Sequence, residues 1–486
     1  MSARQTCLVL LLFLTATFAI YAPCLHGGLI SDDWFLLRTP EIQQFSAANL
    51  RDILDPAGSV AKTYVNYSPV HAVLHALERR AFGDRIPAYH AVNLLVHVSV
   101  SLLLIALFVD TGIPRGAALA GGALFLLHPA NVEAVAWISQ LKTTGAAALA
   151  TAALVWRRRR LLASVLFGLA LLTKAQAAFA LPVLALLEGS ERAERGDRRR
   201  WLWVGVWALL FAGYALLEGR VYADVGAHSN PALEADPFLH LRAIVAIAAR
   251  YLAMAATSHG LSTLHEPPLP ISLADPWWCA GLAAGALLGW RFVHALRRRS
   301  AEAAYWIWAA AGFAPVSQVF PFVNPMGDRY LYFMLPGLLG AALLAGCEAA
   351  RALPARWRDS ESLRTGAAAA ALAVLALFAL RSLERARVFR DDDSYLIDSA
   401  LHYPDGISAH VLRARGYARR GEVDQAMDEL RAARSRGWAW VGILFTDRDF
   451  RPLARDPRFR DFVRELGVKI AGETGDGGAS VREPQR

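Results

Sequence analysis

The sequence is poor in charged residues and in cysteines. Only 19% of its 486 residues are Asp, Glu, Lys or Arg, against about 25% in a typical soluble domain. The four cysteines have no metal-ligand spacing and are too few for a disulfide framework, which excludes a small disulfide scaffold and a cysteine-based zinc site. The net charge of +9 comes largely from short Arg clusters between apolar runs. Such clusters indicate membrane topology rather than a nucleic-acid-binding surface.

The missing charge leaves apolar runs of about the 20 residues that a bilayer crossing needs. The first run, 6–22, has the length of a signal peptide, but the many runs after it favour a retained first helix. The later runs are 89–109, 116–128, 133–155, 161–173, 176–187, 201–218, 276–295, 303–320, 329–348 and 364–381. Together they predict an all-α, polytopic membrane bundle with about eleven spans.

Four basic clusters give the expected orientation, because Lys and Arg are enriched in cytoplasmic loops. They are Arg157 to Arg160, Arg198 to Arg200, Arg297 to Arg299, and Arg351 with Arg356 and Arg358. Counting runs between them predicts a cytoplasmic N-terminus and an external C-terminus. Segment 241–257 does not fit the count. Its Arg242 and Arg250 share one helical face, so we expect it to lie in the interface or to line a cavity.

This topology brings the polar segments of the membrane half to the external face. They are the first loop, 23–88, and segments 128–129, 173–174, 219–275 and 320–329. The first loop contains two adjacent acids, Asp32 and Asp33. A carboxylate near a low-dielectric boundary has a raised proton affinity, which suits a general base. The pair could also bind a metal or cap the following helix with Ser31 or Asp32 as the N-cap, and the dipeptide taken alone favours the cap.

Five sequence blocks follow one another in order over residues 1–390. They are Asp32–Ile42; Tyr67–Val70 with Tyr89–His97; His128–Ile138; Leu172–Lys174 with Leu181–Val183; and Pro315–Gln318 with Asp328–Tyr332. In this order the chain resembles the membrane glycosyltransferases of the GT-C fold, within the mannosyltransferase superfamily. More narrowly, it resembles the transmembrane, tetratricopeptide-repeat (TPR) O-mannosyltransferases and their bacterial relatives.

The resemblance implies an inverting transfer of mannose or another hexose from a polyprenyl-phosphate carrier to a protein or glycan acceptor. The expected place is the external face of a bacterial inner membrane. The acid of the family's first loop corresponds to Asp32 as general base, with Asp33 beside it. The departing lipid phosphate calls for cations, with Arg329 as first choice, Lys174 as second and Arg250 as third. Arg329 as a snorkelling anchor and Lys174 as a structural partner within a helical hairpin remain alternatives.

Seven further residues belong to the same blocks as secondary site candidates: His128, Glu133, His90, Asn93, His97, Asp328 and Tyr330. His90, Asn93 and His97 lie on one face of the second apolar run and are expected to make interhelical hydrogen bonds rather than donor contacts. Glu133 also suits a helix start, where an acid satisfies first-turn amides. No metal site is expected. The donor is the lipid-linked sugar, and a divalent metal is the less favoured alternative.

The sequence also departs from the family. Ser68 stands where the family usually has Arg, Gln140–Thr144 replaces a Gly-Arg-Lys-Asp run, and Ala175 stands where an acid or proline is common. These changes suit a second hypothesis, a catalytically degenerate scaffold that presents its tail to partners, whereas the retained acid pair opposes it. A third, a transporter of lipid-linked sugars, usually carries inverted repeats, and none is evident.

Beyond the membrane domain, 1–385, charge density rises. Residues 386–470 predict an external, TPR-like helical domain that offers a surface for a protein partner, and 471–486 predict a disordered tail because they are polar and Gly-rich. A helical hairpin is expected over His410–Gly437, broken at Arg420 and Gly421. Its expected packing residues are Tyr417, Ala426, Leu430 and Ala433, and further helices are expected at 394–403 and 447–466.

Overall fold

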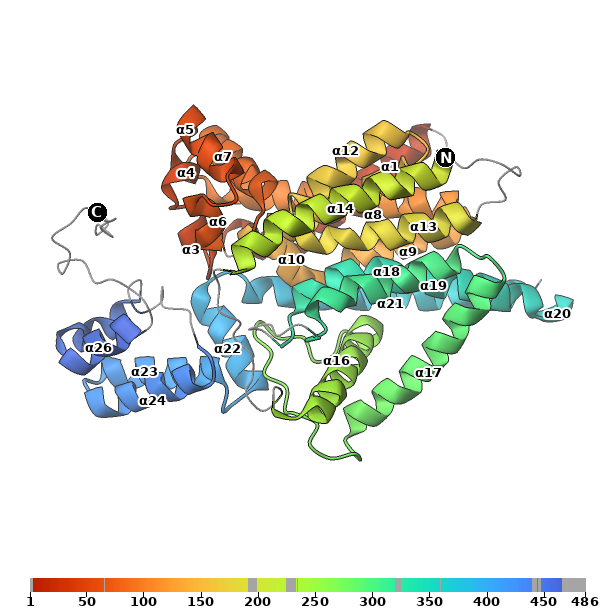
Figure 1. Ribbon diagram of the computed structural model, residues 1–486. Helices are drawn as coiled ribbons and strands as arrows, with labels where there is room; N and C mark the ends of the chain where they lie inside the picture. Colours follow the sequence, from red (N-terminus) through yellow and green to blue (C-terminus); the bar gives the residue numbers. More distant parts are fainter. Residues whose placement is uncertain are drawn as a thin grey trace. The chain divides into compact units, whose positions relative to one another are not determined.

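The computed structural model describes residues 3–64, 66–190, 199–223, 233, 235–319, 325–358, 360–438, 444 and 447–465, which form helices and no strand (Figure 1). The all-α prediction is therefore confirmed for this part of the chain. Two compact units, Met1–Asp391 and Asp392–Arg486, divide the chain close to the expected boundary after residue 385. The tail expected to be disordered, 471–486, lies outside the described residues.

Six helices of the first unit are long and apolar enough to cross a membrane. They are α8 (Ile86–Asp110), α14 (Arg199–Ala223), α16 (Pro237–Thr257), α17 (Pro276–Arg297), α19 (Asp328–Ala352) and α21 (Glu361–Val388). A seventh candidate is bent by 50° between α9 (Arg115–Leu127) and the turns η1 (Pro129–Asn131) and α10 (Val132–Ala136). These helices make the chain an integral membrane protein.

The remaining predicted runs correspond to helices of 11–18 residues. They are α1 (Ala3–Ile20), α11 (Leu141–Val155), α12 (Arg160–Leu171), α13 (Ala180–Ser190) and α18 (Glu302–Phe313). Each is shorter than the roughly 20 residues that cross a bilayer alone. Most of the apolar runs thus coincide with helices, but run 133–155 is broken between α10 and α11, and in run 303–320 the α-helix ends at Phe313. Eleven crossings stays a prediction.

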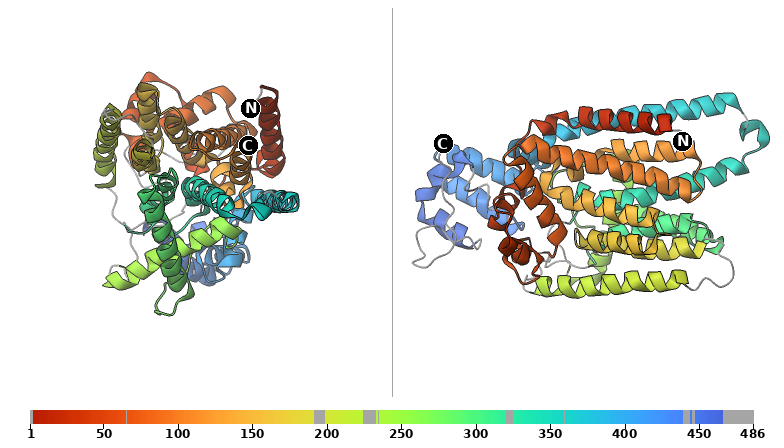
Figure 2. Two further views of the ribbon diagram at one scale, coloured as in Figure 1. Left: turned by 90° about the vertical axis from the view of Figure 1, so that its right-hand side faces the viewer. Right: turned by 90° about the horizontal axis from the view of Figure 1, so that it is seen from above.

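The long helices of the first unit lie largely side by side, and the small helices of the first loop gather at one end of them (Figure 2). At the opposite end, Asp110 of α8 pairs with Arg157 and Arg158, and we call this the basic end. Near the start of α8, Asn93 donates to the carbonyl of Trp137 at 3.0 Å. About 25 Å of helix separates Asn93 from Asp110. We call the Asn93 end the polar end. The cluster of Arg157 and Arg158 lies away from it, as expected, whereas Arg198 of the second cluster is outside the described residues.

The first loop folds on a core of its own at the polar end. Its helices are α3 (Asp33–Leu36), α4 (Pro40–Gln43), α5 (Ala47–Leu54), α6 (Ser59–Tyr64) and α7 (Pro69–Phe82). Ile42, Ile53, Val60, Ala72 and Ala76 form its buried cluster. The loop is tied to the bundle where Glu218 of α14 accepts the Tyr67 amide at 2.6 Å. This anchorage gives the acid pair a fixed support.

Helix α16 covers the segment that did not fit the span count. It is long and apolar enough to cross, and Ala248, Tyr251 and Leu252 line an apolar groove. Neither Arg242 nor Arg250 is among the residues that line this groove, so the expected interfacial or cavity-lining role of this segment, in place of a crossing, stays a prediction. Arg242 is buried, lies over the Phe238 ring and donates to the carbonyl of Ile271.

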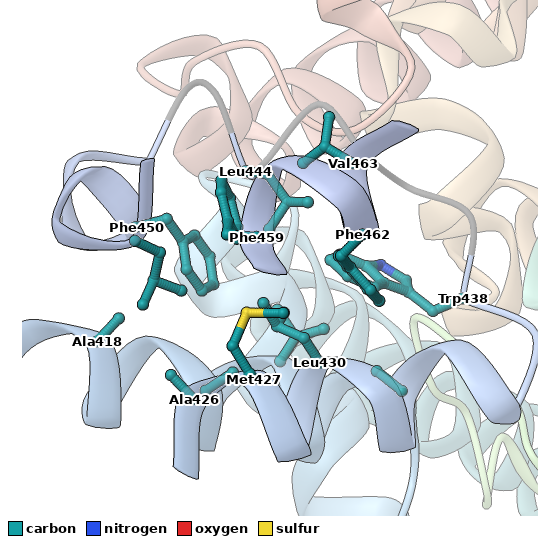
Figure 3. Packing of buried hydrophobic residues seen from close by; sticks show 14 of the residues in the cluster. Ala418, Ala426, Met427, Leu430, Trp438, Leu444, Phe450, Phe459, Phe462 and Val463 are labelled. Atoms are coloured by element: carbon teal, nitrogen blue, oxygen red, sulfur yellow. The ribbon is translucent and has the colours of Figure 1, made fainter. Parts of the chain in front are cut away.

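The second unit is a small helical domain. Its elements are α22 (Asp392–His402), α23 (Ile407–Arg419), α24 (Val423–Ser435), η5 (Arg448–Arg455) and α26 (Pro457–Glu465). Ala426, Leu430 and Ala433 are fully buried, and Met427 packs with Phe450, Phe459 and Phe462 (Figure 3). Gly421 turns the chain between α23 and α24 with φ +75°, a conformation that favours glycine. The predicted hairpin is therefore confirmed, whereas its assignment as a TPR stays a prediction.

Candidate functional site at the polar end

The two acids of the first loop have different environments. Asp33 is fully buried; its carboxylate accepts the Ile30 amide at 3.2 Å and the Ser139 amide at 2.8 Å. Burial raises the pKa of Asp33 to about 8, although both amides oppose the rise. Asp32 is exposed, and among the described residues its side chain accepts no hydrogen bond. Asp33 thus anchors the loop and Asp32 is available to a ligand.

The Asp32 side chain makes no helix-cap hydrogen bond among the described residues. The Asp33 carboxylate accepts the Ile30 amide, three residues before α3 begins at Asp33. Ser31, just before the pair, has φ +48°, which is uncommon for a residue with a side chain. After this turn the first carboxylate of the pair is exposed and the second is buried.

One lysine lies near the acid pair, and a second lysine lies near the first. Lys142, in the first turn of α11, is acted on by the charges of Asp32 and Asp33. Lys174 donates to the Thr143 hydroxyl at 2.8 Å, and the charges of Lys142 and Arg329 both act on it. Both lysines are half-buried, and neither has a carboxylate within ion-pair distance among the described residues. This lysine pair, Lys142 and Lys174, is therefore suited to an anionic ligand.

Arg329 is paired, unlike the lysines. Its guanidinium forms an ion pair with the fully buried carboxylate of Glu133, which also accepts the Arg329 backbone amide at 2.7 Å. The guanidinium lies over the rings of Trp137 and Tyr330, at 5.4 and 4.7 Å. Arg329 therefore joins α19 to α10, and a snorkelling anchor is not the geometry found.

Asp328, the preceding residue, is a junction of three segments. It accepts from the His265 ring at 2.7 Å, from the Ser262 amide at 3.3 Å and from the Arg385 guanidinium at 3.3 Å. Asp328 and His265 are each about 1% exposed. The junction holds the start of α19, and with it Arg329, against the loop after α16 and against the end of α21.

Three other secondary candidates, His97, His128 and Asn93, connect helices to neighbouring segments. The His97 ring bonds the Tyr332 hydroxyl at 2.9 Å and the Leu126 carbonyl at 3.1 Å, which confirms the expected interhelical role. His128 contacts the Ala255 carbonyl at 3.0 Å and accepts the Ala130 amide at 3.2 Å. Asn93 supports the turn at Trp137. His90 is buried beside the backbone of Ala136, but neither of its ring nitrogens makes a hydrogen bond of standard geometry with the described residues, so its interhelical bond stays a prediction. Both nitrogens of His128 and of His97 are thus occupied.

Arg250 occupies a different place from the other two predicted cations. Its guanidinium lies 4.6 Å over the Trp277 ring of α17, whereas Lys174 and Arg329 meet at the Tyr330 ring. Its neighbour Tyr251 reaches the site instead. The Tyr251 hydroxyl accepts the Gly327 amide at 3.0 Å and lies 3.3 Å from the Gly327 carbonyl.

Tyr251 also connects the site to the apolar groove. The groove, of about 290 Å³, lies between α16, α17, α18 and α19, with Phe292, Ile307 and Leu338 among its lining residues. Because Gly327 directly precedes Asp328 and Arg329, one wall of the groove is tied to the cationic region. The groove therefore adjoins the polar end at Tyr251.

The described residues contain no group of three His, Cys, Asp or Glu side chains that could hold a metal ion. His71 and His75 lie edge to face at 4.5 Å, and His75 contacts Glu78 at 2.6 Å. Burial, followed by the neighbouring His75, lowers the pKa of His71. These side chains fill the inner face of α7.

Lys142, His265 and Arg385 belong to the polar end and were not among the predicted candidates. A signal for Lys142 exists, because the sequence has only four lysines among 51 basic residues. A lysine in an apolar run of an otherwise Arg-rich chain is a functional candidate. The sequence gives no such signal for His265 or Arg385, which are identified only through their contacts with Asp328 in the structure.

No protein-family model matches the sequence, and neither does any curated protein. Among solved structures, the chain is similar to the archaeal oligosaccharyltransferase AglB from Archaeoglobus fulgidus, solved in complex with an inhibitory peptide and a dolichol-phosphate. The identity is 15% and the TM-score 0.38; the match covers 87% of this chain and 59% of that protein, less than two thirds of its length. A similarity at this level assigns no activity, so a functional assignment depends on the site.

Proposed function

We propose that the protein is a membrane glycosyltransferase of the GT-C type, which transfers mannose or another hexose from a polyprenyl phosphate to a protein or glycan acceptor. The observation that carries the proposal is a pair of half-buried lysines without a carboxylate partner among the described residues, Lys142 and Lys174, of which Lys142 lies within reach of the charge of the exposed Asp32 carboxylate. A buried charge without a counter-charge is costly. A phosphate ligand would supply that counter-charge.

The chemistry requires a base and a stabilised leaving group. The carboxylate of Asp32 takes the proton of the acceptor hydroxyl as its oxygen attacks the anomeric carbon. The bond from that carbon to the phosphate oxygen breaks, and the polyprenyl phosphate leaves with the electron pair. The lysine pair, with Arg329 close by, stabilises the charge that develops on the phosphate. Attack opposite the leaving group inverts the anomeric centre.

The apolar groove supports a lipid carrier rather than a soluble sugar nucleotide. Its walls carry the side chains of four membrane helices, and its Tyr251 reaches Gly327 at the polar end. A prenyl chain in the groove would place its phosphate near the end of the bundle that holds the lysine pair. No metal or other cofactor takes part in this proposal.

The direct test is transfer of a labelled sugar from a polyprenyl-phosphate donor in membranes that contain the protein, beside mass spectrometry of the purified protein for a bound lipid-linked sugar. Transfer that depends on Asp32 supports the enzyme. If the protein binds the donor but transfers no sugar, and donor binding is unchanged in Asp32→Asn, the scaffold hypothesis is favoured instead. The departures from the family at Ser68 and Gln140–Thr144 also support that hypothesis.

A first prediction separates the two roles of Arg329. Arg329→Ala leaves the Glu133 carboxylate buried without its partner, so we expect a loss of about 3–5 kcal/mol in unfolding free energy. Adding Glu133→Gln should recover much of that stability. Thermal unfolding in detergent measures both effects.

Transfer by the same variants then decides the function of the charge. If Arg329 stabilises the phosphate, the stabilised double variant still transfers about 10²–10³-fold more slowly, and Arg329→Lys keeps part of the rate. A double variant with normal turnover would reassign Arg329 to helix–helix attachment alone.

A second prediction concerns sidedness. We expect a cysteine at Glu422 to react with an impermeant thiol reagent on intact cells and a cysteine at Arg158 to react only after permeabilisation. The background replaces the exposed native thiols Cys7 and Cys279 by serine. The reverse pattern would place the polar end on the cytoplasmic side and remove it from an external acceptor.

A further inference from the structure

Helix α21 contributes to the first unit mainly through its last three turns. Only 6% of its most apolar 18-residue window is buried. By contrast, Phe378, Ser382, Ala386 and, just after the helix, Phe389 are at most 6% exposed. A helix that is solvent- or lipid-exposed over most of its length and buried at one end is held in place by that end. We call residues 378–390 the α21 clamp.

On one side the clamp holds the loop that carries the acid pair. The Cys24 thiol donates to the Ala386 carbonyl at 3.1 Å, and the Gly28 amide donates to the Arg390 carbonyl at 2.9 Å. Gly27 allows this approach, because a Cβ there would lie 2.8 Å from the Arg390 carbonyl oxygen and 3.1 Å from its Cα. The loop backbone is thus fixed a few residues before Asp32.

On the other side the clamp holds the segments next to the cations. Arg385 donates to Asp328 at 3.3 Å, directly before Arg329. Ser382 donates to the Leu127 carbonyl at 2.9 Å, at the end of α9, and Arg381 donates to the Ser258 hydroxyl at 3.0 Å. The Phe378 ring lies edge to face against His128 at 4.8 Å. One stretch of helix therefore contacts the start of α19, the end of α9 and the loop after α16.

We propose that the α21 clamp is the positioning element of the site: it sets the acid loop at a fixed distance from the cation-bearing start of α19, and Arg385 and Gly27 are its positioning residues. Neither residue needs to contact a ligand. The inference rests on the proposed transfer for its activity readout, since an error of about 1 Å in the placement of reacting groups costs on the order of 10²-fold in rate.

The sharpest test uses two neighbouring glycines. Gly27→Ala inserts a methyl group between the loop and the Arg390 backbone, whereas Gly28→Ala is the matched control, because a Cβ there meets nothing within 4 Å. Both variants keep every side chain of the site and every backbone amide. We expect Gly27→Ala to lower kcat for transfer by about 10- to 100-fold with KM for the donor little changed, and Gly28→Ala to behave like the parent protein.

Hydrogen exchange of the full chain in detergent supplies a readout that does not depend on activity. We expect the amides of Ser262 and of Gly327 to Tyr330 to exchange at least several-fold faster in both Gly27→Ala and Arg385→Gln. In Arg385→Gln the junction at Asp328 loses its third hydrogen-bond partner, and in Gly27→Ala the clamp that supports the junction is displaced. Melting temperatures and exchange at the basic end, around Asp110, report whether the variant is folded there.

The outcomes separate this inference from the proposed function. Faster exchange at the junction in Gly27→Ala but not in Gly28→Ala supports the clamp even if no sugar transfer is found in any variant, which would count against the enzyme alone. Unchanged exchange and unchanged transfer in folded Gly27→Ala and Arg385→Gln would overturn the clamp and leave the enzyme intact.

Discussion

Asp32→Asn is expected to abolish sugar transfer while the protein still folds and binds its donor. The amide is nearly isosteric with the carboxylate but cannot take the acceptor's proton, and loss of a general base costs about 10²–10⁴-fold in rate. Because Asp32 is exposed and accepts no hydrogen bond from the described residues, its replacement leaves no structural contact unmade. The measurement is transfer of labelled sugar beside donor binding on the same preparation.

The neighbouring acid should respond differently. An asparagine at position 33 offers one acceptor oxygen where Asp33 uses two, toward Ile30 and Ser139. We expect Asp33→Asn to lose about 1–3 kcal/mol of stability through the unpaired amide and to slow transfer less than Asp32→Asn does. Asp84→Asn, an exposed acid of the same loop, is the control and should retain full activity. Normal transfer by Asp32→Asn with a dead Asp33→Asn would exchange the two roles, and normal transfer by both would refute the acid pair as the base.

The second large effect is expected at the lysine pair. Lys142→Met and Lys174→Met should each reduce transfer by about 10²–10³-fold, the usual result of losing one group that stabilises transition-state charge. In the absence of donor the same variants should melt at a higher temperature than the parent, because each removes one of two like charges that act on each other. The donor-induced rise in melting temperature should also shrink.

This combination of lower activity and higher stability distinguishes a ligand-binding lysine from a structural one. Lys62→Met, at an exposed position of the first loop, is the matched control and should change neither quantity. Destabilised lysine variants with normal donor binding would show that the lysines support the fold and would remove the main argument for a phosphate ligand. Arg329→Ala should change the stability in the opposite direction, because loss of Arg329 leaves a buried carboxylate unpaired.

The sequence by itself determined where the apolar helices are and which segments separate them. A membrane helix satisfies its own backbone hydrogen bonds, so a run of apolar residues is sufficient evidence for it, and runs such as 89–109 and 329–348 correspond to α8 and α19. The helical hairpin of the tail was also predictable, because burial of Ala426, Leu430 and Ala433 follows from their spacing on one helical face. These are local properties of the chain.

Only the tertiary structure decided which of the candidate residues takes which role at the site. Asp32 and Asp33 are equivalent in the sequence, and they differ because Ser139, 106 residues away, donates its amide to one of them. Arg329 was the first choice for the phosphate, yet Glu133, 196 residues earlier, already pairs with it, and Lys142 beside the acids had not been chosen at all. Hydrogen bonds and ion pairs act over a few ångströms, so the partner of a polar side chain depends on how the helices pack and is not encoded in the residues next to it.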